Sequence, residues 1–120
     1  MGNNLRKYLQ VDNHKYMIDK KIKSIVSRYI TNVKKQGIPV KGVYIFGSYA
    51  KGVANKHSDI DVCIISKKFG IDRQKERILL MNMRSDNDDL IEPHPFSPND
   101  FSNPFDPLAY QIKKQGFLIM

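Results

Sequence analysis

Two carboxylates two residues apart are the strongest indication of chemistry in this sequence. Asp59 and Asp61 flank Ile60 and are followed by an apolar run, Val62 to Ile65. Residues i and i+2 of a β-strand point to the same side, so both carboxylates can share one hard divalent cation. Ile60 and Val62 then point into the core and hold the pair rigidly. The spacing predicts a divalent-metal site at the start of a strand.

A Gly-Ser step shortly before this pair predicts a place for phosphate. Gly47 and Ser48 follow the apolar run Val43 to Phe46. Glycine lets the backbone turn sharply, and exposed amides with the serine hydroxyl can then hold phosphate oxygens. The stretch is not an ATP-binding P-loop, because Val-Ala follows Gly52 where that motif requires Lys and then Ser or Thr. A phosphate-binding turn beside a carboxylate-bound metal is what phosphoryl or nucleotidyl transfer requires.

The composition limits the class of protein. The chain has 120 residues, 41% of them apolar and 27% charged, which predicts one globular domain over residues 1–120, with residues 1–12 loosely ordered. Its apolar runs are too short to span a membrane, and its first residues lack the apolar core of a signal peptide, so we expect a cytoplasmic protein without a membrane partner. The single cysteine, Cys63, excludes an internal disulfide and a cysteine-based zinc site.

The two halves of the chain differ in charge. Residues 1–58 contain 12 Lys and Arg against 2 Asp, whereas residues 59–120 contain 8 Lys and Arg against 10 Asp and Glu. A basic half beside a carboxylate-rich half suits a polyanion bound next to a metal site. A solvated basic helix that keeps the protein in solution accounts for the same charge equally well.

The helices and strands that must position these residues follow from the spacing of the apolar residues and from the residues that begin or end each segment. Apolar residues recur at helical spacing through residues 15–36, and β-branched and aromatic residues predict strands at 40–46, 59–65 and 90–96, the last at a sheet edge or ended early by its prolines. Residues 47–58 read as a loop that opens with a helical turn. A second helix is expected at 72–83 with Ile78, Leu79 and Met83 on its inner face, and a last one at 103–115 with Asn103 as its N-cap. The order predicts a small α/β or α+β domain.

The combination Gly47-Ser48, ten residues, and Asp59-Ile60-Asp61 resembles the signature of the polymerase-beta-like nucleotidyltransferase superfamily. It is most similar to the minimal nucleotidyltransferase group, whose members read Gly-Ser-x-Ala-x-Gly and then Ser-Asp-x-Asp. Seven positions match: Gly47, Ser48, Ala50, Gly52, Ser58, Asp59 and Asp61. The resemblance covers residues 40–96 and implies the nucleotidyltransferase fold, a short mixed β-sheet with helices packed against it.

The resemblance also implies a third carboxylate on a neighbouring strand. Glu92 lies in the middle of the most strand-like window after Asp61, whereas Asp88 and Asp89 fit a polar turn before it, so we expect Glu92 to complete the set. The implied reaction is an in-line displacement at the α-phosphate of a nucleoside triphosphate, ATP above all, supported by two Mg²⁺ or Mn²⁺ ions. Asp59, Asp61 and Glu92 would be the metal ligands, and Glu92 would take the proton of the attacking hydroxyl.

Further residues are candidates for the phosphate side of the same site. Gly47 and Ser48 would hold the β- and γ-phosphates, with Ser58 beside the carboxylates. Lys51 and Lys56 would steer the triphosphate or serve only as solvated charges.

Four other side chains have two readings each. His94 either faces the cleft with Glu92 or is a surface histidine between prolines. His57 either touches phosphate or is an ordinary loop residue. Cys63 lies near the site or is a small buried apolar residue, and Tyr49 stacks on the nucleotide or packs on the sheet.

The length of the chain bears on its partners. Larger relatives carry an additional helical domain for the base and acceptor, for which 120 residues leave no space. The resemblance implies completion of the site by a helical HEPN-type partner, as antitoxin to toxin, or by a homodimer, and Phe96, Phe101 and Phe105 would form either a partner surface or part of the core. The acceptor is a hydroxyl of a protein or a small molecule. The alternative is a non-catalytic module that neutralises a partner by contact. Few aromatics accompany the basic helix, which argues against a nucleic-acid partner.

Overall fold

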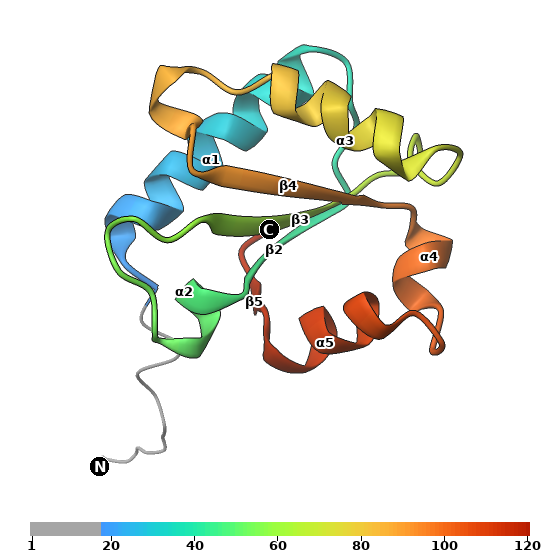
Figure 1. Ribbon diagram of the computed structural model, residues 1–120. Coiled ribbons are helices and arrows are strands. Elements are labelled where there is room, and N and C mark those ends of the chain that lie inside the picture. The colour runs from blue at the N-terminus through green and yellow to red at the C-terminus, as the bar shows by residue number, and fades with distance from the viewer. Residues whose placement is uncertain (1–17) are drawn as a thin grey trace.

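The computed structural model describes residues 18–120 (Figure 1), and the expectation for residues 1–12 lies outside this range. Its elements in chain order are α1 (Lys20–Lys35), β2 (Gly42–Phe46), α2 (Ser48–Lys51), β3 (Ile60–Ile65), α3 (Arg73–Asn82), the 3-10 turn η2 (Asp86–Asp88), β4 (Ile91–Phe96), α4 (Pro98–Ser102), α5 (Pro107–Gln115) and β5 (Phe117–Leu118). None of the helices in the described part is long and apolar enough to cross a membrane.

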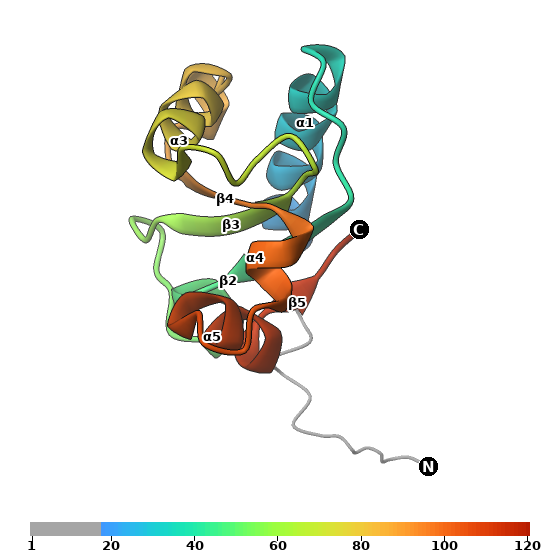
Figure 2. The same cartoon turned by 90° about the vertical axis from the view of Figure 1, so that its right-hand side faces the viewer.

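The strands form one mixed sheet in the order β4-β3-β2-β5. β2 pairs antiparallel with both β3 and β5, and β3 pairs parallel with β4. Helices α1 and α3 cover one face of this sheet, and α4 and α5 cover the other (Figure 2). The expected mixed sheet with packed helices is confirmed, and β5, a two-residue strand that periodicity does not reveal, is added to it.

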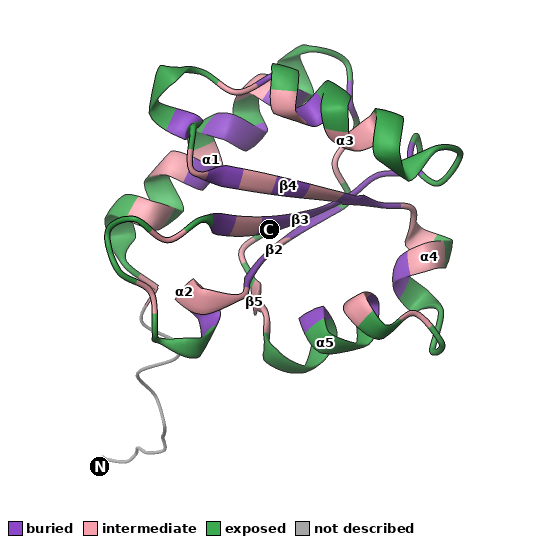
Figure 3. Cartoon of the chain, in the orientation of Figure 1, coloured by how far each residue is buried: buried purple, intermediate pink, exposed green. Residues whose placement is uncertain are grey.

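β3 divides its residues between the two faces. Ile60, Val62 and Ile64 belong to the core beneath α1 and α3, whereas Cys63 and Ile65 belong to the smaller core on the side of α4 and α5. Asp61 lies on the same side as these two, as strand alternation requires. Figure 3 shows the buried residues gathered along the strands and the inward sides of the helices.

β4 runs the full length of its predicted window despite two prolines. Ile60 N–H donates to the carbonyl of Leu90 at 2.7 Å, so alternate residues from Leu90 onward turn their hydrogen-bonding groups toward β3. Pro93 and Pro95 fall between them, with their nitrogens toward the open edge. A residue without an N–H costs no ladder bond there, which explains why this edge strand tolerates both prolines.

α1 confirms the expected amphipathic helix over its described length. Val26, Tyr29, Ile30 and Val33 are buried on one side, and the side chain of Asp19 caps the first turn by accepting from the N–H of Lys21. The hydroxyl of Tyr29 donates to the carbonyl of Leu80 in α3 at 2.6 Å, and this bond joins the two helices on that face.

The prediction of which residues form the buried face of α3 is partly wrong. Leu80 and Met83 are buried, but Ile78 and Leu79 are 53% and 45% exposed. The helix begins after Asp72, whose side chain accepts from the N–H of Lys75, and the orientation that buries Leu80 turns its apolar neighbours outward.

The last helix begins later than predicted. Asp106, with two N–H groups donating to its side chain, is the N-cap of α5, and Pro107 takes the first position, whereas Asn103 ends the separate short helix α4. Asp-Pro and Asn-Pro steps both signal a helix start, and the sequence offers both. Phe101 is buried between the two helices and the sheet, so it belongs to the core, while Phe105 in the intervening turn is 88% exposed.

Candidate active site

The pairing of β3 with β4 aligns the predicted carboxylates. Asp61 is the register partner of Glu92, and Cys63 is the partner of His94. Parallel partners present their side chains on the same face, so Asp61, Glu92 and His94 lie together on the side of α5. Glu92 lies on the adjacent strand as predicted, but as the second residue of β4 rather than in its middle. Asp88 lies in the η2 turn before that strand, as predicted, and is buried there.

Gly47 brings the Gly-Ser step against Asp61. Phe46 is the register partner of Asp61 on β2, and Gly47 follows at φ +75°, a conformation that favours glycine. A Cβ atom built on Gly47 would lie 3.2 Å from Cγ of Asp61 and would collide with its Oδ2. Glycine is therefore required at position 47 for two reasons. The backbone has a positive φ, and a Cβ atom would collide with the carboxylate of Asp61.

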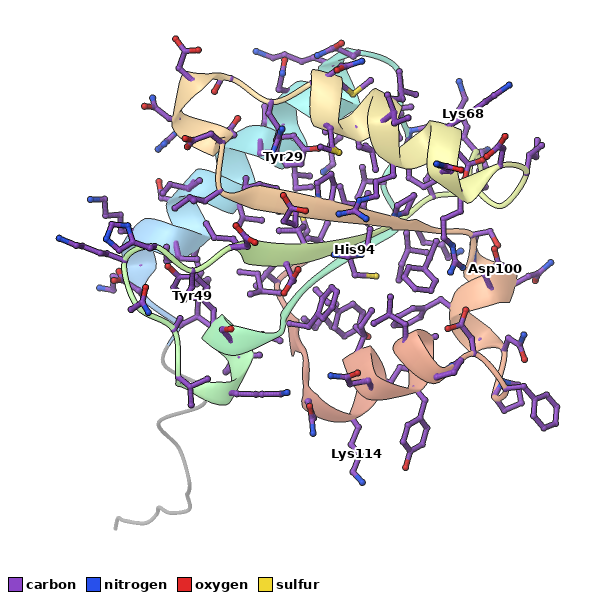
Figure 4. All side chains as sticks on the ribbon, in the orientation of Figure 1. Tyr29, Tyr49, Lys68, His94, Asp100 and Lys114 are labelled. Carbon is purple, nitrogen blue, oxygen red and sulfur yellow. The ribbon has the colours of Figure 1, made fainter. Side chains whose placement is uncertain are left out.

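Asp61 also contacts the imidazole of His94. Nε2 of His94 lies within hydrogen-bonding distance, 3.2 Å, of Oδ1 of Asp61. The imidazole packs edge-on against Phe46, with ring centroids 5.0 Å apart (Figure 4). Of the two readings of His94, the structure supports the one that places it with Glu92 on the side of Asp61.

Asp59 is the residue immediately before β3 and is exposed. Within the described residues its carboxylate makes no hydrogen bond or ion pair. Asp61 keeps Oδ2 beside Gly47. The two carboxylates of the Asp-x-Asp step thus differ, since one is held by neighbours and the other is open to solvent.

Glu92 is held by arginines that sequence reasoning missed. Nη2 of Arg77 donates to Oε1 of Glu92 at 2.7 Å, and Nη1 of Arg84 lies 3.9 Å from Oε2. Arg77 belongs to α3 on the opposite face of the sheet and reaches Glu92 around the edge strand β4. No local pattern marks this residue, because its partner is fifteen positions away and reached only through the β3–α3–β4 packing.

The loop between α2 and β3 is organised around Asn55. Oγ of Ser58 accepts from the N–H of Asn55, the hydroxyl of Tyr49 donates to its carbonyl, and the N–H of His57 donates to its Oδ1. Ser58 therefore holds the loop that precedes Asp59. Tyr49 packs against the main core, between α2 and α1 in Figure 4, rather than standing free in the cleft.

The remaining candidates divide between surface and core. Lys51, Lys56 and His57 are exposed. Ser48 is half-buried at the start of α2, and its hydroxyl makes no hydrogen bond within residues 18–120. Cys63 is fully buried, and burial raises the pKa of its thiol to about 12, which makes it the small apolar core residue of the two readings.

The donor set at this end of the sheet suits a hard divalent cation. Asp59 and Asp61 supply carboxylate oxygens, the ligands that Mg²⁺ and Mn²⁺ prefer, and the carboxylate of Asp59 has no competing partner in the described chain. Among residues 18–120, no three His, Cys, Asp or Glu side chains converge as a ready metal cluster. Glu92, the expected third ligand, is the register partner of Asp61 on β4, but its carboxylate is paired with Arg77.

Comparison with known proteins agrees with this geometry. A model of the nucleotidyltransferase domain family matches residues 16–113. A crystal structure of "a putative nucleotidyltransferase from Sulfolobus solfataricus" matches with a TM-score of 0.51 and 20% sequence identity, over 87% of this chain and 80% of that chain. At this identity the likeness shows a common fold. No curated protein matches the sequence significantly.

Proposed function

Because this chain belongs to the nucleotidyltransferase domain family, we propose that it transfers AMP from ATP to a hydroxyl of a protein or small molecule and releases pyrophosphate. One observation carries the proposal: Asp61 stands between Gly47 and the register position of Glu92, with Asp59 open beside it. This arrangement puts a candidate cation site next to a candidate phosphate site.

The roles of the residues follow from their places. Asp59 and Asp61 hold a divalent cation, Mg²⁺ or Mn²⁺, with Glu92 as the third ligand once it is free of Arg77. That cation, when bound, neutralises phosphate oxygens and the charge that develops on the leaving pyrophosphate. Gly47 and Ser48 face the β- and γ-phosphates with backbone amides and the serine hydroxyl. Lys51, exposed on α2, attracts the triphosphate, and Ser58 keeps the intervening loop in place.

The transfer step is a single in-line displacement. The acceptor oxygen forms a bond to the α-phosphorus while the bond from that phosphorus to the bridging oxygen of pyrophosphate breaks. The acceptor proton passes to the carboxylate of Glu92, which acts as general base. The imidazole of His94, whose Nε2 lies 3.2 Å from Oδ1 of Asp61, keeps the carboxylate of Asp61 oriented.

We further propose that another chain supplies the acceptor or completes its binding site. The described chain has no helical domain beyond the helices that cover the sheet. A helical HEPN-type protein, paired with this chain as toxin to antitoxin, or a second copy of this chain would fill this role. The alternative function is a contact-only module that neutralises its partner without transfer. A glycine that leaves room for a carboxylate favours the enzyme, because contact alone does not need it.

The experiment is label transfer in a lysate of the source cell with Mg²⁺ and, separately, Mn²⁺. We expect the added protein to transfer label from α-³²P-ATP to a protein or small molecule. With γ-³²P-ATP it should add no label above that which the lysate gives without it, and the other three nucleotides are tested in parallel. Asp59→Ala and Asp61→Ala should each reduce the label about 100-fold or more, since each removes charge stabilisation at the reacting phosphate.

Asp89→Ala is the matched control, because Asp89 is exposed, its side chain makes no bond in the described chain, and the same charge is lost. Label that survives in the Asp59 and Asp61 variants, or no label with any nucleotide and either metal, would contradict transfer at this site. The second outcome would move the assignment to the contact-only module.

A further inference from the structure

The two arginines beside Glu92 are bound very differently. Arg84 donates from Nε to the carbonyl of Met81 at 3.1 Å, and from Nη1 to the carbonyls of Asp89 and Ile91 at 3.2 and 2.9 Å. These bonds tie the end of α3 to the start of β4, and Glu92, at 3.9 Å, is an additional and weaker contact. Arg84 is therefore fixed whether or not Glu92 is present.

Within the described chain, Glu92 is the only hydrogen-bond partner of the Arg77 side chain. Nη2 of Arg77 donates to Oε1 at 2.7 Å, and its Nε is buried without any hydrogen-bond partner among residues 18–120. A buried donor without a partner is rare in folded proteins and costs free energy. A single strong hydrogen bond holds the end of the Arg77 side chain, whose Nε has no partner in the described chain. The side chain is 41% exposed. Such a guanidinium can exchange its partner without disturbing the core.

The bond of Arg77 occupies the carboxylate that the site requires. Glu92 is the register partner of Asp61 on an adjacent parallel strand, so a cation held by Asp61 would use the same carboxylate. A guanidinium and a divalent cation repel each other at this range, and Oε1 cannot serve both. Among residues 18–120, Asp59, Asp61 and Glu92 do not form a ready cluster.

We propose that Arg77 is an internal cation that competes with a divalent metal ion for Glu92 and so sets the metal affinity of the site. The proposal rests on the proposed function. With Arg77 on Glu92, the described chain offers only Asp59 and Asp61 to a cation at this site. When Arg77 swings outward, Glu92 completes the set. Arg77 is a positioning residue that acts through Glu92.

The test is a titration of the full chain with Mn²⁺, in which free Mn²⁺ is measured by electron paramagnetic resonance without nucleotide. We expect Arg77→Met to bind Mn²⁺ about tenfold more tightly than the wild type, or to bind an additional equivalent, because a nearby positive charge is removed and Glu92 is released. Arg77→Lys keeps a positive charge on α3 and should stay within about threefold of the wild type. Thermal unfolding checks that each variant is folded.

Two controls separate release of Glu92 from a general change in charge. Lys75→Met removes the same charge from an exposed position of α3 and should leave Mn²⁺ affinity unchanged. In Arg77→Met/Glu92→Gln, the gain should disappear. An equal or weaker affinity in folded Arg77→Met, or a gain that survives in the double variant, would overturn the proposal.

The same titration keeps the two proposals apart. Mn²⁺ binding by the wild type that is lost in Asp59→Ala/Asp61→Ala, together with an unchanged Arg77→Met, refutes the role of Arg77 and leaves the metal site intact. No Mn²⁺ binding by either the wild type or Arg77→Met refutes both. Binding by Arg77→Met alone supports the competition in its strongest form.

Discussion

The two faces of β3 are built for different tasks. Toward α1 and α3, the strand presents Ile60, Val62 and Ile64, all almost completely buried in the larger core. Toward α5, it begins with Asp61 and continues with Cys63 and Ile65 in the smaller core. The difference shows how a short strand can hold a carboxylate rigidly, because its apolar face and the buried Cys63 and Ile65 fix the backbone and leave Asp61 half-buried near its start.

The largest expected effect comes from adding one methyl group at Gly47, beside Asp61. Gly47→Ala should reduce transfer about 100-fold or more, since its Cβ would collide with Asp61 and displace a charge-stabilising carboxylate. Gly37→Ala is the matched control, because Gly37 also has a positive φ but a Cβ added there would meet no described atom within 4 Å. Label transfer measures both, and equal activity of the two variants would contradict the close fit of Gly47 around Asp61.

A substitution on the apolar face should act on stability instead. Ile64→Ala is expected to lower the free energy of unfolding by about 2–5 kcal/mol, because it leaves a cavity among fully buried neighbours. Denaturant unfolding measures this cost. Transfer per folded molecule should be retained below the unfolding transition, and an activity loss as large as that of Gly47→Ala would show that the two faces are not separable.

The smallest effect concerns the buried thiol of Cys63, on the same face of β3 as Asp61. Burial raises the pKa of Cys63 from its ordinary value near 9 to about 12, so the folded chain keeps the proton that the unfolded chain loses above pH 9. This contribution is fully present below pH 9 and is lost progressively as the pH rises toward 12. By about pH 11, the wild type should have lost about 2–3 kcal/mol relative to its own stability at about pH 8 through this group.

Cys63→Ala should lack that part of the alkaline loss, as measured by urea unfolding at about pH 8 and about pH 11. Tyr29, whose pKa is also raised by burial, is present in both proteins, so the difference between them isolates the thiol. Identical alkaline slopes in the two proteins would show that the thiol ionises freely in the folded state.

Much of the site could be predicted because its parts are local. The Gly-Ser turn, the Asp-x-Asp step and the apolar alternation of β3 involve residues that are close in sequence, and the structure has each of them. The edge position of β4 was one of the two alternatives that its prolines left open. The start of α5 did not follow, because two Asx-Pro steps compete in the sequence, and the structure has Asp106 as the cap while Phe101 of α4 packs against α5 and the sheet.

By itself, the sequence determined most of the segments that become helices and strands and the side of β3 that carries Asp61, since both depend on backbone geometry and on the nearest neighbours in the chain. It did not reveal β5 or the separation of α4 from α5. Only the tertiary structure decided the partners of the carboxylates of Asp61 and Glu92. The pairing of Asp61 with His94 spans 33 positions and that of Glu92 with Arg77 spans 15. Such pairs depend on strand register and on a helix that reaches around a sheet edge, and no periodicity in the sequence records either.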